Sequence, residues 1–244
     1  MKGRRLLLDA GNTRLKWAVV ENRTWLAQGS ASYSDLSALT QVIDQHAACF
    51  IASVVCAQHE KQITTLLASY SISPIWLTTE STCLDVSNAY LNSRQLGVDR
   101  WMGLIASRER SHAATLVVSV GTAMTVDALS AEGEFLGGLI VPGIVLMQRA
   151  LQQGTDKVAE VSGVYQTFPR TTADAVQSGI IAALCGAIQR QFEHLTYVAG
   201  KPPRVILTGG DAETLSPFLD LQVELAPLLV LEGMERVTRE GELT

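Results

Sequence analysis

Short apolar runs separated by turn-forming residues open the chain, and their spacing predicts strands. Three such runs precede residue 31, with Gly11 and Asn12 in the first turn and residues 21–23 in the second, so a three-stranded meander is expected. Apolar positions then recur at strand and helix spacing up to residue 110. The expected elements are strands over 5–9, 15–20, 24–30, 50–56 and 74–78, and helices over 34–46, 60–70 and 99–110.

The same order of elements returns in the second half of the chain. Strands are expected over 115–119, 123–129, 134–141 and 204–207, and helices from Gly143 to about Gln153 and over 173–198. The two halves match at an offset of about 110 residues, which indicates internal duplication of an α/β unit. We therefore expect two domains, 1–112 and 113–244. No linker separates them, so a cleft between closely packed halves is expected.

Composition and charge narrow the function classes. Hydrophobic residues make up 47% of the 244 residues and charged residues 18%, which is typical of a globular protein. The formal net charge of −5 disfavours nucleic acid as a partner. No apolar run is long enough for a signal segment or a membrane span, and residues 225–231 are broken by Pro227. The four cysteines lack metal-ligand spacing, so we expect buried free thiols in a cytoplasmic protein.

Each half carries a glycine–threonine turn directly after a buried strand. Tight turns of this kind expose backbone N–H groups that bind phosphate oxygens, and two of them facing each other would hold a nucleotide from both sides. Asp9 precedes the first turn and is placed to orient hydrated Mg²⁺, while Lys16 follows it and is placed to bring positive charge to a transferring phosphoryl group. Ordinary hairpin turns are the alternative interpretation. The chain has no GxxxxGK[ST] sequence, which excludes a P-loop.

Further glycines and one acidic turn add candidate contacts. The stretches 137–143 and 208–210 would let backbone approach a flat ligand such as adenine, although ordinary turn chemistry is the alternative. Asp99 lies at the start of a helix, where it would either cap the helix or accept a proton from a substrate hydroxyl. The four histidines lie outside these motifs, so no histidine base is expected.

Five motifs, in order, resemble the type III pantothenate kinases of the acetate and sugar kinase, Hsp70 and actin superfamily. They are DAGNTRLKWA, LGVDRW, VGTAMTVDAL, GGLIVPG and TGG, between Leu7 and Gly210. The resemblance implies two ribonuclease H-like (actin-like ATPase) α/β domains. It also implies transfer of the ATP γ-phosphoryl group to the primary hydroxyl of pantothenate, giving 4′-phosphopantothenate in the first step of coenzyme A biosynthesis.

The resemblance also assigns roles by position. Asp99 would be the proton acceptor, and Thr172 would reach the substrate from the partner subunit of a homodimer. The expected ATP and phosphate contacts are Asp9, Ala10, Gly11, Asn12, Thr13, Arg14, Leu15, Lys16, Gly121 and Thr122. The expected adenosine contacts are Gly138, Pro142, Gly143, Gly209 and Gly210. The expected pantothenate contacts are Tyr90, Gly97, Val98, Asp99, Arg100 and Thr172.

One position departs from the family pattern. Family members often carry an aspartate three residues before the second-loop threonine, where it binds an activating K⁺ or NH₄⁺, and this chain has Ser119 there. A neutral hydroxyl is a weaker ligand for a hard cation, so we expect reduced K⁺ dependence. Asp127, further along the same strand, would either face the phosphates beside Mg²⁺ or cap the strand end.

Two other functions stay open at this level. A sugar-type kinase of the same superfamily would share the ATP site and use a different acceptor. A nucleotide-binding transcriptional accessory factor would keep the phosphate loops without needing a proton acceptor, and Asp99 argues against it.

Overall fold

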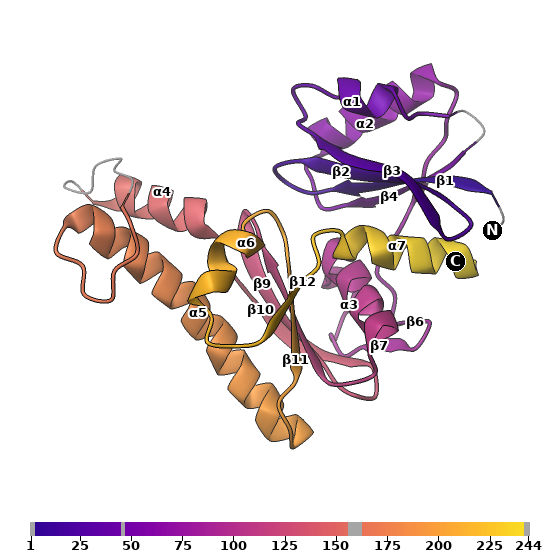
Figure 1. Ribbon diagram of the computed structural model, residues 1–244. Coiled ribbons are helices and arrows are strands. Elements are labelled where there is room, and N and C mark those ends of the chain that lie inside the picture. Colours follow the sequence, from indigo (N-terminus) through magenta and orange to yellow (C-terminus); the bar gives the residue numbers. More distant parts are fainter. Residues whose placement is uncertain (1–2, 45–46, 156–162, 242–244) are drawn as a thin grey trace. The chain divides into compact units, whose positions relative to one another are not determined.

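The computed structural model describes residues 3–44, 47–155 and 163–241 (Figure 1). Contacts divide the chain into two compact units. Unit 1 contains the described residues up to Ser111 and those from Leu228 onward, and unit 2 runs from His112 to Pro227. Each unit combines a sheet with helices, so the expected α/β class is confirmed.

The sheet of unit 1 has the strand order β3-β2-β1-β4-β5. The first three strands are antiparallel neighbours, as the two turns predicted, and β4 and β5 continue the sheet in parallel. The strands of this sheet are β1 (Arg4–Ala10), β2 (Leu15–Glu21), β3 (Thr24–Ala31), β4 (Ala48–Ser53) and β5 (Ile75–Trp76). Two further strands, β6 (Thr82–Cys83) and β7 (Val86–Asn88), pair with each other in an antiparallel hairpin.

Helices lie on both sides of this sheet, with α1 and α2 on one side and α7 on the other (Figure 1). Successive side chains of β1 point to opposite faces of the sheet, toward the helices on each side. Leu6 and Leu8 pack with Ile63 and Leu67 of α2, whereas Arg5 points the other way and bonds to Glu235 of α7. The helical elements are α1 (Ser37–Thr40), α2 (Ala57–Ser69), η1 (Ser93–Gln95), α3 (Val98–Arg110) and α7 (Leu229–Glu240).

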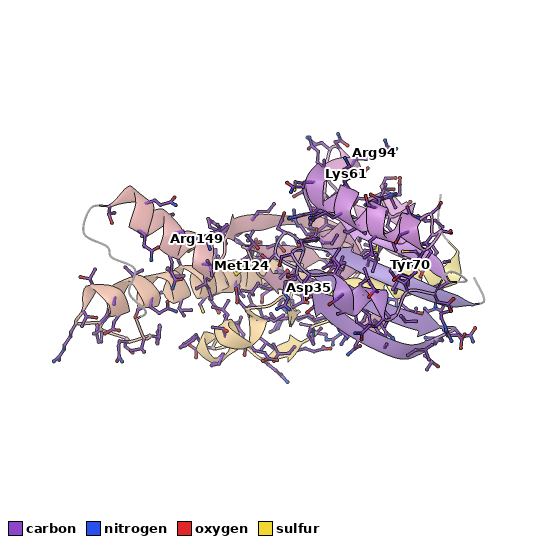
Figure 2. The ribbon with its side chains drawn as sticks, turned by 90° about the horizontal axis from the view of Figure 1, so that it is seen from above. Asp35, Lys61, Tyr70, Arg94, Met124 and Arg149 are labelled. Atoms are coloured by element: carbon purple, nitrogen blue, oxygen red, sulfur yellow. The ribbon has the colours of Figure 1, made fainter. Side chains whose placement is uncertain are left out.

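Unit 2 contains the strand order β12-β11-β8-β9-β10. One face of this sheet is apolar and packs against the long helix α5, and Met124 at the start of β9 is fully buried in that core (Figure 2). The elements are β8 (Thr115–Val120), β9 (Ala123–Leu129), β10 (Glu134–Pro142), α4 (Ile144–Gly154), α5 (Thr172–Ala199), β11 (Arg204–Thr208), α6 (Ala212–Leu215), η2 (Ser216–Phe218) and β12 (Val223–Leu225).

The two units share one topology. In each, a three-stranded antiparallel meander is extended at its first strand by two parallel strands, so β1 to β5 correspond to β8 to β12. Asp9 is the second-last residue of β1, and Ser119 is the second-last residue of β8. The predicted duplication of an α/β unit is therefore visible in the strand order itself.

Two expectations about the elements differ from the structure. The helix expected over 34–46 is only the four-residue α1, and in it the Thr40 hydroxyl donates to the Ser37 carbonyl at 2.7 Å. A side chain that bonds local backbone in this way competes with helix propagation. Residues 45 and 46 lie outside the described residues.

The C-terminal helix α7 groups with unit 1, whereas the sequence placed it in a second domain of 113–244. Gly233 of α7 lies so close to α3 that a Cβ there would be 1.9 Å from the Met102 carbonyl oxygen. Arg110 on α3 also donates three hydrogen bonds to the Glu232 carboxylate, at 2.6, 2.7 and 2.9 Å. These contacts join residues more than a hundred positions apart, so no local pattern predicts them.

Two further expectations concern membranes and thiols. Among the described residues, no helix is long and apolar enough to cross a membrane. Cys49, Cys56, Cys83 and Cys185 are thiols that form no disulfide with one another. The expectation that they are buried is right for Cys49 and wrong for Cys56, which is exposed at the start of α2.

Candidate active site

The first glycine turn lies at the end of β1 in unit 1. Asp9 and Lys16 are opposite each other in the antiparallel β1–β2 pair, so their side chains leave the same face of the sheet. The loop is fixed from two sides. The Val54 N–H donates to the Ala10 carbonyl at 3.1 Å, and the Tyr33 hydroxyl donates to the Gly11 carbonyl at 2.8 Å.

The Asp9 carboxyl is buried, and its ionisation is strongly perturbed. Burial raises its pKa from 3.8 to about 7, the nearby charge of Asp99 raises it further, and Lys16 opposes the shift. Such a group changes charge near neutral pH. Perturbed carboxyls of this kind are typical of sites that handle charged ligands or protons.

Asp99 lies in the first turn of α3, as the sequence predicted. Its Oδ1 accepts the backbone N–H of Arg100 at 2.8 Å, and burial raises its pKa despite that bond and the Arg100 charge. A Cβ at Gly97 would lie 2.6 Å from the same Oδ1. Glycine at position 97 therefore leaves the space that the Asp99 carboxylate occupies.

The structure brings two other predicted substrate contacts together. The buried Arg100 donates from Nη1 to the Tyr90 hydroxyl at 3.3 Å, and its guanidinium lies 5.9 Å from the centre of the Tyr90 ring. The Tyr90 N–H in turn donates to Asn88 at 3.0 Å. A fixed cation with an aromatic neighbour, next to a buried carboxyl, suits a polar ligand that bears a carboxylate and a hydroxyl.

The second glycine turn, in unit 2, is held by backbone bonds. The Asp211 N–H donates to the Val120 carbonyl at 3.0 Å, and the Gly143 N–H donates to the Thr122 carbonyl at 2.9 Å. Glycine is required at both flanking positions. A Cβ at Gly143 would be 1.9 Å from the Gly121 carbonyl oxygen, and Gly209, at φ +97°, would place one 2.2 Å from that of Val120.

The remaining predicted residues divide by exposure. Those with buried side chains would meet a ligand through backbone only, and they are Ala10, Leu15 and Val98. Those that are exposed are Asn12, Thr13, Arg14, Thr122, Pro142, Thr172 and Gly210. Thr172 is the first residue of α5, and its neighbour Thr171 is the helix cap.

Gly138 stands apart from the other glycines of the predicted adenosine site. It lies mid-strand in β10, opposite Asp127. It lies four positions before Pro142, a distance of about 13 Å along a strand.

Most residues near the predicted cation positions carry side-chain hydroxyl groups. Ser119 pairs with Thr125 on β9 and with Thr208 on β11, and the buried Thr125 hydroxyl has no hydrogen-bond partner among the described residues. Asp127 is buried within β9, four residues from its start, so it caps no strand end. In the described part of the chain, no group of three His, Cys, Asp or Glu side chains is placed to hold a metal ion.

Sequence reasoning missed three residues that shape the first turn. Val54 contributes its N–H, Tyr33 its hydroxyl, and His59 stacks flat on the Tyr33 ring with centroids 3.9 Å apart. The histidines lie outside the motifs, so the sequence assigns them no role. The contact depends on tertiary packing between the chain after β3 and α2, and no local signal marks it.

Two α/β units of identical topology, each with a glycine turn after its first strand, give this chain the fold of actin-like ATPases and sugar kinases. The fold is similar to that of a Campylobacter jejuni protein described as a Baf family transcriptional activator, with a TM-score of 0.62, 22% identity and coverage of 97% of this chain and 98% of that one. It is also similar to a Sinorhizobium meliloti protein described as a 2-dehydro-3-deoxygalactonokinase, with a TM-score of 0.61, 13% identity and coverage of 97% and 98%.

Sequence comparison identifies the family. The family model for type III pantothenate kinases matches residues 5–194. A type III pantothenate kinase of Thiobacillus denitrificans is 57% identical over 99% of both chains, and one of Nitrosospira multiformis is 40% identical over 98% of this chain and 92% of its own. The chain belongs to the type III pantothenate kinase family, whose members are ATP-dependent phosphotransferases, and the resemblance drawn from the five motifs is confirmed.

Proposed function

We propose that this chain transfers the γ-phosphoryl group of ATP to the primary hydroxyl of pantothenate, giving 4′-phosphopantothenate. Family membership supplies the reaction class. One observation assigns this reaction to particular residues. The Asp99 carboxyl is buried, occupies the space that a Cβ at Gly97 would fill, and lies in the same unit as the first glycine turn.

In this proposal each glycine turn is a phosphate-binding loop. Their outward N–H groups donate to phosphate oxygens, and the hydrogen bonds to the Ala10 and Thr122 carbonyls keep each turn in one conformation. Lys16 supplies positive charge where the γ-phosphoryl group transfers. Phosphoryl transfer depends chiefly on such positioning and charge stabilisation.

Asp99 is the proton acceptor. As the pantothenate oxygen forms its bond to the γ-phosphorus, the bond from that phosphorus to the β–γ bridging oxygen breaks, and the hydroxyl proton passes to the Asp99 carboxylate. A pKa raised by burial makes that carboxylate a better base than an exposed aspartate. Arg100 and Tyr90 bind the substrate carboxylate and its polar chain.

Mg²⁺ would be held mainly by the nucleotide phosphates and water, with Asp9 as one carboxylate near it, because a single carboxylate suits an ion that keeps most of its waters. When bound, it neutralises phosphate charge. A monovalent cation at Ser119 would meet hydroxyl ligands, so weak K⁺ dependence is expected. The proposal also includes a cytoplasmic homodimer in which Thr172 completes the partner's substrate site.

The test is release of ADP from ATP and Mg²⁺, with and without pantothenate and with and without K⁺. We expect ADP release that requires pantothenate and changes little with K⁺. Asp99→Asn should retain nucleotide binding and lose most turnover. Asp35→Asn is the matched control, since Asp35 is an exposed aspartate of the same unit that accepts one backbone N–H (Figure 2).

Two results would contradict the proposal. Nucleotide binding without pantothenate-dependent turnover would remove pantothenate as acceptor and favour another acceptor or a regulatory role. Full activity of Asp99→Asn would remove Asp99 as the base. A strict K⁺ requirement that disappears in Ser119→Ala would contradict the cation argument alone.

A further inference from the structure

Tyr33 lies outside the phosphate-binding motif but contacts the first glycine turn. Its hydroxyl donates to the Gly11 carbonyl at 2.8 Å, and that carbonyl belongs to the residue at the head of the turn. The Tyr33 ring lies against the His59 imidazole, with centroids 3.9 Å apart and an angle of 5° between the planes. His59 is in the first turn of α2, so the ring is held by a regular element.

The duplicated topology shows what this contact corresponds to. In unit 2, the residue directly after the third strand of the meander, Gly143, donates its N–H to the Thr122 carbonyl of the second turn. In unit 1, Tyr33 is the second residue after the third strand, β3. In both units the chain leaving the third strand donates one hydrogen bond to a carbonyl of the glycine turn, by backbone in one and by a phenol in the other.

We propose that Tyr33 is a positioning residue for nucleotide binding, which holds the first glycine turn through the Gly11 carbonyl, and that His59 fixes the Tyr33 ring. This rests on the proposed function in one respect, that the turn holds nucleotide phosphates. With the Gly11 carbonyl bonded to Tyr33, the neighbouring N–H groups of the turn keep one orientation toward the phosphate. Without that bond, the peptide can rotate and nucleotide binding must reorder it.

The hydroxyl is suited to permanent donation. Burial, with the nearby Asp9 and Cys56, raises the pKa of Tyr33 to about 12, so the phenol keeps its proton throughout the working pH range. The ring is only partly buried and packs against the core of unit 1, and phenylalanine keeps that ring, so loss of the hydroxyl leaves the packing of β1 and α2 in place.

The test compares Tyr33→Phe with wild type in the full chain. Binding of ADP, measured by calorimetry, should weaken about fivefold, the effect of one hydrogen bond, and KM for ATP should rise by the same factor. KM for pantothenate and the unfolding midpoint should stay close to wild type, which a general loss of structure would not allow. Tyr70→Phe is the control, because Tyr70 is an exposed tyrosine of the same unit at the end of α2 (Figure 2).

His59 is tested by rescue. His59→Ala should weaken ADP binding about twofold to threefold because it removes the stacked ring, whereas His59→Phe should restore wild-type binding. ADP binding by Tyr33→Phe within twofold of wild type would overturn the proposal, as would equal increases in both KM values. Wild-type ADP binding and pantothenate turnover are measured in the same series, so failure of the proposed function shows separately from failure of this inference.

Discussion

The Asp9→Asn substitution tests whether burial controls the charge on the carboxyl at the end of β1. Asparagine keeps the size of the side chain and removes its titration. The pKa of Asp9 is raised from 3.8 to about 7, first by burial and then by the charge of Asp99. Ionised Asp9 therefore destabilises the folded protein at neutral and alkaline pH.

The sign follows from proton counts in the two states. Between pH 3.8 and 7 the folded Asp9 binds a proton and the unfolded one does not, so the free energy of unfolding falls as pH rises. This contribution to stability is fully present below pH 3.8 and is lost above about pH 7. A shift of this size corresponds to roughly 4 kcal/mol at 1.36 kcal/mol per pKa unit.

Urea unfolding followed by tryptophan fluorescence measures the free energy of unfolding of unit 1. All four tryptophans, Trp17, Trp25, Trp76 and Trp101, lie in unit 1 with Asp9. We expect Asp9→Asn to resemble wild type near pH 4 and to be more stable than wild type at pH 8, by up to roughly 4 kcal/mol. The same substitution should reduce turnover, since Asp9 belongs to the proposed phosphate site.

Asp35→Asn is the control, because a backbone N–H from Ser37 lowers the pKa of the exposed Asp35. The contribution of Asp35 to the free energy of unfolding is therefore lost as pH falls, which is the opposite of the pH dependence expected for Asp9. The reasoning is refuted if the stability difference between wild type and Asp9→Asn changes by less than about 1 kcal/mol between pH 4 and pH 8.

Three other substitutions test the site. Gly97→Ala places a Cβ 2.6 Å from the Asp99 carboxylate, so kcat should fall at least about 10²-fold with the urea midpoint unchanged; normal kcat would show that the carboxylate tolerates displacement. Lys16→Ala should lower kcat about 10²–10³-fold in the ADP-release assay, and near-normal turnover would remove Lys16 from the mechanism. Gly209→Ala, at φ +97°, places a Cβ 2.2 Å from the Val120 carbonyl oxygen, so the free energy of unfolding of unit 2 should fall by about 2 kcal/mol. Circular dichroism follows this unfolding, and an unchanged transition would contradict the close approach.

Much of the site could be predicted because its parts are local. A glycine turn directly after a buried strand is visible in any ten residues around Gly11 or Gly121, and Asp99 at a helix start is equally local. What could not be predicted is which of these residues are coupled. The effect of Asp99 on Asp9, and the contact of Tyr33 with Gly11, join residues 90 and 22 positions apart.

The sequence by itself determined the strand and helix periodicities, the two glycine turns and the duplication, because each depends on neighbours within a few positions and on one pattern that occurs twice. Tertiary structure decided the rest. It placed α7 on unit 1 through Arg5 and Glu235, whose side chains meet although 230 positions separate them. It also buried Asp9, because burial depends on residues that the fold brings together and not on composition. Burial in a low-dielectric interior raises the pKa of that carboxyl toward neutrality.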